Sequence, residues 1–162
     1  MEKASRLRLL DAALDLLGGS GAASLTVRAV EDAAGLPHGS VRHHFGDRSR
    51  MVACLFDHLA ERDVKQADGD VVAALEYWLG PGRVVTLARY ELFLMAARDP
   101  SLRAPLVRAR EQFVAIAAEQ VGARAARAVV AALDGLLLDA LVRGGTGGDE
   151  LRRAVASITG SG

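Results

Sequence analysis

The sequence has few aromatic residues, a single cysteine and no excess of either charge. Aromatic residues make up 4% of the 162 residues, and the abundance of alanine, leucine and arginine favours helices over sheets. Cys54 is the only cysteine, which excludes an intramolecular disulfide and fits a reducing compartment; we expect a core thiol there. The 20 basic residues balance 20 acidic ones, which argues against a non-specific DNA coat but permits a local basic surface.

Long apolar runs and targeting signals are also missing. No segment approaches the roughly 20 apolar residues of a membrane helix, and no N-terminal stretch has the pattern of a secretory signal. We therefore expect a soluble protein of the cytoplasm, without a membrane partner. Hydrophobic residues account for 51% and charged residues for 25% of the chain, as in ordinary folded domains.

Hydrophobic periodicity predicts an all-α fold. Apolar residues recur at three- and four-residue steps, glycine or proline separates the segments, and neither an alternating strand pattern nor an internal repeat is present. The predicted helices cover about 3–17, 25–34, 38–44, 47–66, 71–79, 83–98, 102–121, 123–143 and 149–158. The predicted breaks are Gly18–Gly21, Gly35–Pro37, Asp68–Asp70, Gly80–Gly82 and Gly144–Gly148. We expect a head at 1–46, a connecting helix at 47–66 that begins at an Asp47 cap, and a helical-bundle body at 67–162.

The stretch 24–50 predicts a helix-turn-helix, in which a second, polar helix is held at a steep angle to the first. Ser24 or Thr26 can cap the first helix, and Gly35 provides the turn after it. Val41 and Phe45 would anchor the second helix in the core. The side chains left facing outward are His38, Ser40, Arg42 and His43. These groups can donate to base edges or phosphates, and Arg28, Arg48 and Arg50 add positive charge nearby.

Five segments resemble, in order and spacing, the signature of the TetR family of bacterial transcriptional regulators. The segments are LLDAA (9–13), TVRAV (26–30), AGL (34–36), GSVRHHF (39–45) and DR (47–48). Weaker resemblance to the regulatory bodies of the family lies at RYELFL (89–94) and DGLLL (134–138). The match covers roughly the first sixty residues and is far more specific than a lone helix-turn-helix.

The resemblance implies a homodimeric DNA-binding regulator, typically a repressor that leaves its double-stranded operator when a small-molecule effector binds the body. It implies no enzymatic activity. The pattern and the resemblance together give these DNA-binding residues: Thr26, Arg28, His38, Gly39, Ser40, Arg42, His43, His44 and Arg48.

The sequence departs from the family pattern at four positions. The family usually has tyrosine where Arg42 stands, lysine at Arg48, alanine at Glu31 and a polar cap at Pro37. Arg42 changes a phenol contact into a guanidinium contact, and Pro37 removes a side-chain cap from the recognition helix. Glu31 is expected to turn outward or to weaken binding by facing phosphate. An alternative therefore stays open: a helical ligand-binding or adaptor protein of the same fold that has lost operator recognition.

The body carries two further predictions. Helices 123–143 and 149–158 resemble the pair that forms an intersubunit four-helix bundle in the family, although the same face could be buried within one subunit. Aromatic residues and methionine line most ligand pockets; for each of these side chains taken singly core packing is the better explanation, but we expect some of them to border a pocket. The candidate pocket residues are Tyr77, Trp78, Tyr90, Phe93, Met95 and Phe113.

No residue pattern indicates a metal, a cofactor or a catalytic group. The four histidines lack the i, i+4 spacing with a carboxylate that zinc enzymes use. Cys54 and His58 lie one helical turn apart, but no third orienting group follows, so we expect no nucleophilic pair.

Overall fold

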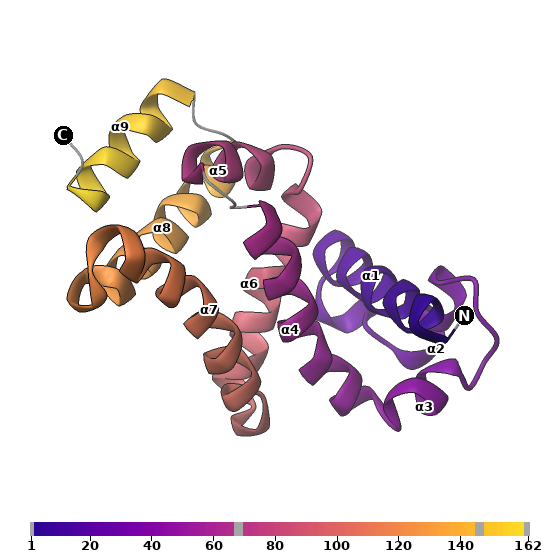
Figure 1. Cartoon of the computed structure of the whole chain (residues 1–162). Helices are drawn as coiled ribbons and strands as arrows, with labels where there is room; N and C mark the ends of the chain where they lie inside the picture. The colour runs from indigo at the N-terminus through magenta and orange to yellow at the C-terminus, as the bar shows by residue number, and fades with distance from the viewer. Residues whose placement is uncertain (1, 67–69, 145–147, 161–162) are drawn as a thin grey trace. The chain divides into compact units, whose positions relative to one another are not determined.

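The computed structural model describes residues 2–66, 70–144 and 148–160, and every regular element in these ranges is helical (Figure 1). The prediction of an all-α fold is confirmed. The elements are α1 Glu2–Ser20, η1 Ala22–Ser24, α2 Val27–Ala33, α3 Ser40–Phe45, α4 Arg48–Gln66, α5 Val71–Leu79, α6 Arg83–Arg98, η2 Pro100–Leu102, α7 Arg103–Val121, α8 Ala123–Arg143 and α9 Gly148–Thr159. None of these helices is long and apolar enough to cross a membrane.

The chain forms two compact units. The first consists of Met1–Glu61 with Val84–Arg108, and the second of Arg62–Arg83 with Ala109–Gly162. The helices α4, α6 and α7 each contribute to both units.

The core of the first unit is built on α1. Leu10, Leu14 and Leu17 recur at steps of four and three, so they share one face of the helix, and all three are buried. The fully buried residues of this unit include Leu9, Leu10, Leu14, Leu17, Leu25, Val30, Met51, Leu55 and Leu92. The helix α4 adds the buried side chains of Met51, Val52, Leu55, Phe56 and Leu59. The N-cap at Asp47 is confirmed, because the amide of Arg50 donates to Asp47 Oδ1 at 2.9 Å.

The helix α1 runs to Ser20, three residues beyond its predicted end at Leu17. Gly18 does not break the helix. A Cβ atom at Gly18 would lie 1.8 Å from the carbonyl oxygen of Val84, so the glycine allows the backbone of α6 to approach. The helix ends at Gly21, whose φ of +75° only glycine adopts readily.

Arg6 and His58 tie further elements of the first unit together. Arg6 donates to the Sγ atom of Cys54 at 3.3 Å, and its guanidinium lies 5.1 Å from the ring centroid of Phe45. Nε2 of His58 lies 2.8 Å from Oδ1 of Asp11. The half-buried Cys54 therefore sits at the edge of the core as an acceptor for Arg6.

The second unit packs α5, α8 and α9 around an aliphatic core. Asp70 caps α5 by accepting hydrogen bonds from the amides of Val72 and Ala73 at 2.9 and 3.1 Å. Residues 67–69 and 145–147, which contain most of two predicted breaks, lie outside the described residues. The buried side chains are Ala74, Leu75, Trp78, Ala126, Val129, Leu137, Ala140, Leu141, Leu151 and Val155.

Candidate nucleic-acid interface

The two ends of α2 are capped in different ways. Thr26 is the N-cap, because its Oγ1 accepts the amide of Ala29 at 3.2 Å, whereas Ser24 donates to the carbonyls of Leu16 and Gly21. The C-terminal end is closed by Gly35 at φ +61°, and Leu36 donates its amide to the carbonyl of Glu31 at 3.0 Å. This is a Schellman motif, which confirms Gly35 as the residue that ends the helix.

A second, type II turn leads from α2 into α3. The amide of Ser40 donates to the carbonyl of Pro37 at 3.2 Å, and Gly39 has φ +95° and ψ −6°. The left-handed Gly39 cannot belong to a helix, so α3 begins at Ser40 and not at the predicted His38. Val41 and Phe45 are buried, as predicted.

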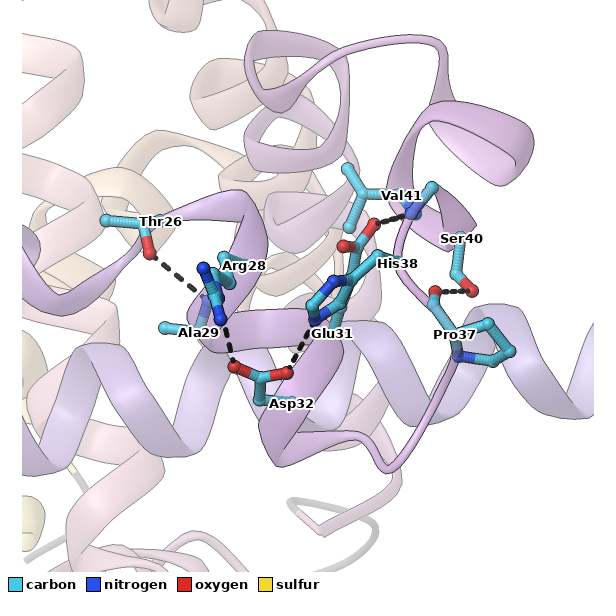
Figure 2. A network of polar contacts seen from close by, with 10 residues as sticks. Thr26, Arg28, Ala29, Glu31, Asp32, Pro37, His38, Ser40 and Val41 are labelled. Atoms are coloured by element: carbon cyan, nitrogen blue, oxygen red, sulfur yellow. Dashed lines mark hydrogen bonds and ion pairs between the residues drawn. The ribbon is translucent and has the colours of Figure 1, made fainter.

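Glu31 lies inside this turn and not outside it. Its side chain is 2% exposed, and its Oε1 accepts the amides of Gly39 at 3.0 Å and Val41 at 2.9 Å (Figure 2). The expectation that Glu31 turns outward or faces phosphate is therefore wrong. Its carboxylate joins α2 to the first residues of α3.

Asp32 organises the outer surface of the same turn. Its carboxylate lies 2.9 Å from Nε2 of His38 and 3.8 Å from Nε of Arg28 (Figure 2). Both partners are predicted DNA-binding residues and both are exposed. Asp32 therefore restrains His38 and Arg28 on one side of α2.

The exposed face of α3 carries the remaining polar groups. Among the described residues, no ion-pair partner lies near Arg42, which is exposed. Ser40 donates its hydroxyl to the carbonyl of Pro37, which leaves the hydroxyl oxygen able to accept a hydrogen bond. The rings of His43 and His44 are 4.9 Å apart, edge to face.

Arg48 is the first residue of α4 and extends the same surface. Its Nε donates to the carbonyl of Leu25 at 2.7 Å, which fixes the guanidinium beside the start of α2. The two terminal nitrogens of Arg48 are not used in that bond. We name the surface formed by α2, α3 and Arg48 the α2–α3 face.

One group of possible metal ligands occurs among the described residues. Glu2, His43 and His44 each offer one ligand atom, and these atoms lie within 4.8 Å of one another. Glu2 Oε1 is 3.8 Å from His43 Nε2, and both side chains are largely exposed. The exposure is that of a solvated contact between two surface side chains, and the absence of a metal stays a prediction.

Two residues that stabilise the turn between α2 and α3, Arg8 and Glu31, were not predicted from the sequence to do so. Arg8 of α1 donates to the carbonyl of Ala34 and thereby places a cation at the C-terminal end of α2. Glu31 was recognised only as a departure from the family pattern. The signal that could have identified it is the neighbouring Pro37, which leaves the start of α3 without a side-chain cap.

The candidate pocket residues are divided between the two units. Tyr90 and Phe93 lie together on α6, with ring centroids 5.9 Å apart and planes at 77°. In the second unit, Trp78 on α5 is buried and Phe113 on α7 is half-buried. This partial burial fits both core packing and a pocket wall, so the pocket stays a prediction.

The fold and the α2–α3 face define a helix-turn-helix DNA-binding protein. Residues 9–53 match the family described as bacterial regulatory proteins, tetR family, and residues 62–161 match the tetracyclin repressor-like C-terminal domain. The chain belongs to the TetR family of transcriptional regulators. It is therefore a DNA-binding regulator and not an enzyme.

Solved structures of similar proteins agree with this assignment. A member of the TetR family from Streptomyces coelicolor A3 is 29% identical over 96% of this chain and 98% of that chain, with a TM-score of 0.82. The multidrug binding protein EbrR, complexed with proflavin, is 32% identical over 95% of this chain and 99% of that chain, with a TM-score of 0.69. EbrR complexed with malachite green is 29% identical over 95% and 97%, with a TM-score of 0.74. No curated protein sequence matches the chain.

Proposed function

We propose that the chain is a homodimeric repressor whose two α3 helices enter successive major grooves of a palindromic operator. A small molecule bound in the body would favour a conformation in which the α3 helices no longer match the groove spacing of about 34 Å. The observation that carries the proposal is the α2–α3 face, where polar and basic side chains are exposed around a rigidly capped turn. A regulator of this kind works where the DNA is, and we therefore expect it in the cytoplasm.

The nine predicted residues have separate roles in this proposal. Arg42 and Ser40 face base edges, because α3 is the helix that enters the groove. Arg28 and Arg48 contact phosphates, as do the hydroxyl of Thr26 and the imidazoles of His38, His43 and His44. Gly39 is exposed and has no side chain, so the DNA backbone can approach it closely.

Dimerisation is proposed to use the outer surface of α8. Apolar or small residues recur there at alternating steps of three and four, and all of them are exposed in the single subunit. We name them the outer stripe of α8: Ala128, Ala131, Gly135, Leu138 and Val142. The buried residues of α8, such as Ala126 and Leu137, lie on a different face. This division favours an intersubunit role for α8 over burial of all its apolar residues within one subunit, with α9 as the second helix of the interface.

The effector is proposed to be a small aromatic or apolar molecule bound in the body. EbrR was solved with proflavin and with malachite green, and both compounds are suitable first probes of this chain. Trp78 is the only tryptophan, so its fluorescence reports on α5 without interference. Titration of the DNA-free protein with malachite green tests binding, and a probe that binds must then weaken the operator complex.

The proposal of operator binding is tested with DNA that flanks the gene of this protein. We expect a retarded band at low salt and a footprint with two half-sites. Arg42→Ala should weaken operator binding by about 5- to 150-fold, because a good base contact contributes about 1–3 kcal/mol. Arg103→Ala is the matched control, since Arg103 is an exposed arginine on α7 outside the α2–α3 face. Equal effects of the two substitutions would contradict the role of α3.

One of the observations that favoured the alternative, a ligand-binding or adaptor protein of the same fold without operator recognition, no longer supports it. It was suggested by Arg42, by Glu31 and by the zero net charge. Glu31 is buried and accepts two amides of the turn, so it adds no exposed negative charge to the α2–α3 face.

A further inference from the structure

We propose that Glu31 is a positioning residue for operator recognition, acting from α2 as the cap of the recognition helix α3. The carboxylate takes over the role of the side-chain cap that Pro37 cannot provide. The proposal explains two departures from the family pattern as one device. Its DNA-binding part rests on the function proposed above, whereas its capping part concerns the protein alone.

The recognition helix needs such a cap more than a longer helix does. It has six residues, and a helix of that length is unstable unless its ends and its apolar face are held. The first amides of any helix lack partners within the helix. Gly39, at the N-cap position, has no side chain, and the side chain of Pro37 carries no acceptor.

Three amides at the start of α3 nevertheless have acceptors. The carbonyl of Pro37 accepts the amide of Ser40, and Oε1 of Glu31 accepts the amides on either side of it, those of Gly39 and Val41. The negative carboxylate also lies at the positive end of the helix dipole. Two charge-assisted hydrogen bonds thus compensate the burial of the charge.

The position of these bonds connects Glu31 to recognition. Gly39 and Val41 flank Ser40, and Arg42 follows directly, so the same oxygen holds the backbone of the residues proposed to read bases. Since Glu31 belongs to α2, its bonds fix the approach of α3 to α2 and not only the conformation of α3 itself. A loosened start of α3 would spread Ser40 and Arg42 over several orientations.

Three variants separate the cap from other roles of Glu31. Glu31→Met keeps the volume of the side chain but removes the acceptor. Glu31→Gln keeps an acceptor, and because both bonds end on a single oxygen, the amide oxygen of glutamine can receive both. In Glu31→Met with Pro37→Ser, the serine hydroxyl can accept the amide of Gly39 two residues further on and so restore a local cap.

Two measurements apply to each variant at a temperature where it is folded. Amide hydrogen exchange of Gly39 and Val41, followed by NMR without DNA, should be fastest in Glu31→Met. It should be intermediate in Glu31→Gln, which keeps the acceptor but loses the charge, and partly restored in the double variant. Operator affinity, measured by fluorescence anisotropy, should fall about tenfold in Glu31→Met, the factor that corresponds to about 1.4 kcal/mol. It should fall less in Glu31→Gln and in the double variant, as the exchange rates do. Affinity for non-specific DNA should change little, since it depends on phosphate contacts.

Several results would overturn the proposal. Wild-type exchange of the Gly39 and Val41 amides in Glu31→Met would show that Glu31 is not the cap. A fall in affinity that is equal for operator and non-specific DNA would show a merely structural role. If Glu31→Met does not fold, Glu31→Asp decides: it keeps the charge but is one methylene shorter, and wild-type exchange and operator affinity in it would refute the cap. Failure of the wild-type protein to bind any operator would overturn the positioning role together with the proposed function, while the exchange data would still identify the cap.

Discussion

Replacing Val142 by aspartate should separate the two subunits of the proposed homodimer. Val142 lies on the outer stripe of α8 and is 80% exposed in the single subunit, next to Leu138, which is 44% exposed. An apolar side chain this exposed stabilises the protein only if a second surface covers it and removes it from water. In the proposed dimer both copies of Val142 are covered.

The expected size of the effect follows from that exposure. Full burial of a valine side chain contributes about 1.5–2 kcal/mol. Eighty per cent of this value, counted for two copies, gives about 2.4–3.2 kcal/mol, or about a 50- to 200-fold weaker dimer. The carboxylate of Val142→Asp adds the cost of burying a charge, so the factor is a lower bound.

The assay is sedimentation equilibrium over a range of protein concentrations. Val107→Asp is the matched control, because Val107 is 55% exposed but lies on α7, in the other compact unit and outside α8. We expect Val107→Asp to dimerise as the wild type does and Val142→Asp to be largely monomeric. If both variants dimerise with wild-type affinity, the outer stripe of α8 is not the interface.

Two further predictions concern packing and pH. Gly18→Ala should destabilise the protein by about 1–3 kcal/mol, because the new Cβ would lie 1.8 Å from the carbonyl oxygen of Val84. In the matched control Gly19→Ala the new Cβ meets nothing within 4 Å, so this substitution should be neutral or stabilising by up to about 1 kcal/mol. Thermal unfolding compares the two, and equal melting temperatures would refute the close approach of α1 and α6. The hydroxyl and amide of Ser101 donate to Asp99 at 2.7 and 2.9 Å and lower the pKa of its carboxyl group. The ionised carboxylate of Asp99 therefore stabilises the folded state at pH values above its ordinary pKa. This contribution is lost as the pH falls through the lowered pKa. In a carbon-13 NMR titration, Ser101→Ala should move the midpoint of Asp99 upward, and an unchanged midpoint would contradict the assigned cause.

Helix positions were predictable where strong local signals mark both ends. The predicted boundaries of α5, α6 and α8 coincide with those in the structure, because a capping aspartate, a glycine or a proline stands beside each end. The apolar face of α4 was also predictable, since periodicity alone determines which side of a long helix is buried.

The remaining features depend on contacts between different elements of the fold. Gly18 looks like a helix stop, and only the backbone of α6 beside it explains why the helix continues. Gly39 lies in the turn and not in α3, and its amide is held by Glu31, eight residues earlier. The direction of the Glu31 side chain follows from how α2 and α3 cross, and the sequence does not contain that angle explicitly.

In the proposed complex, two copies of α3 contact DNA one duplex turn apart. Hydroxyl-radical footprinting of the wild-type protein on its operator, combined with the mass of the complex from light scattering, tests this claim directly. We expect two protected patches whose centres are about 10 base pairs apart, with two protein chains bound. A single protected patch occupied by one chain would contradict it.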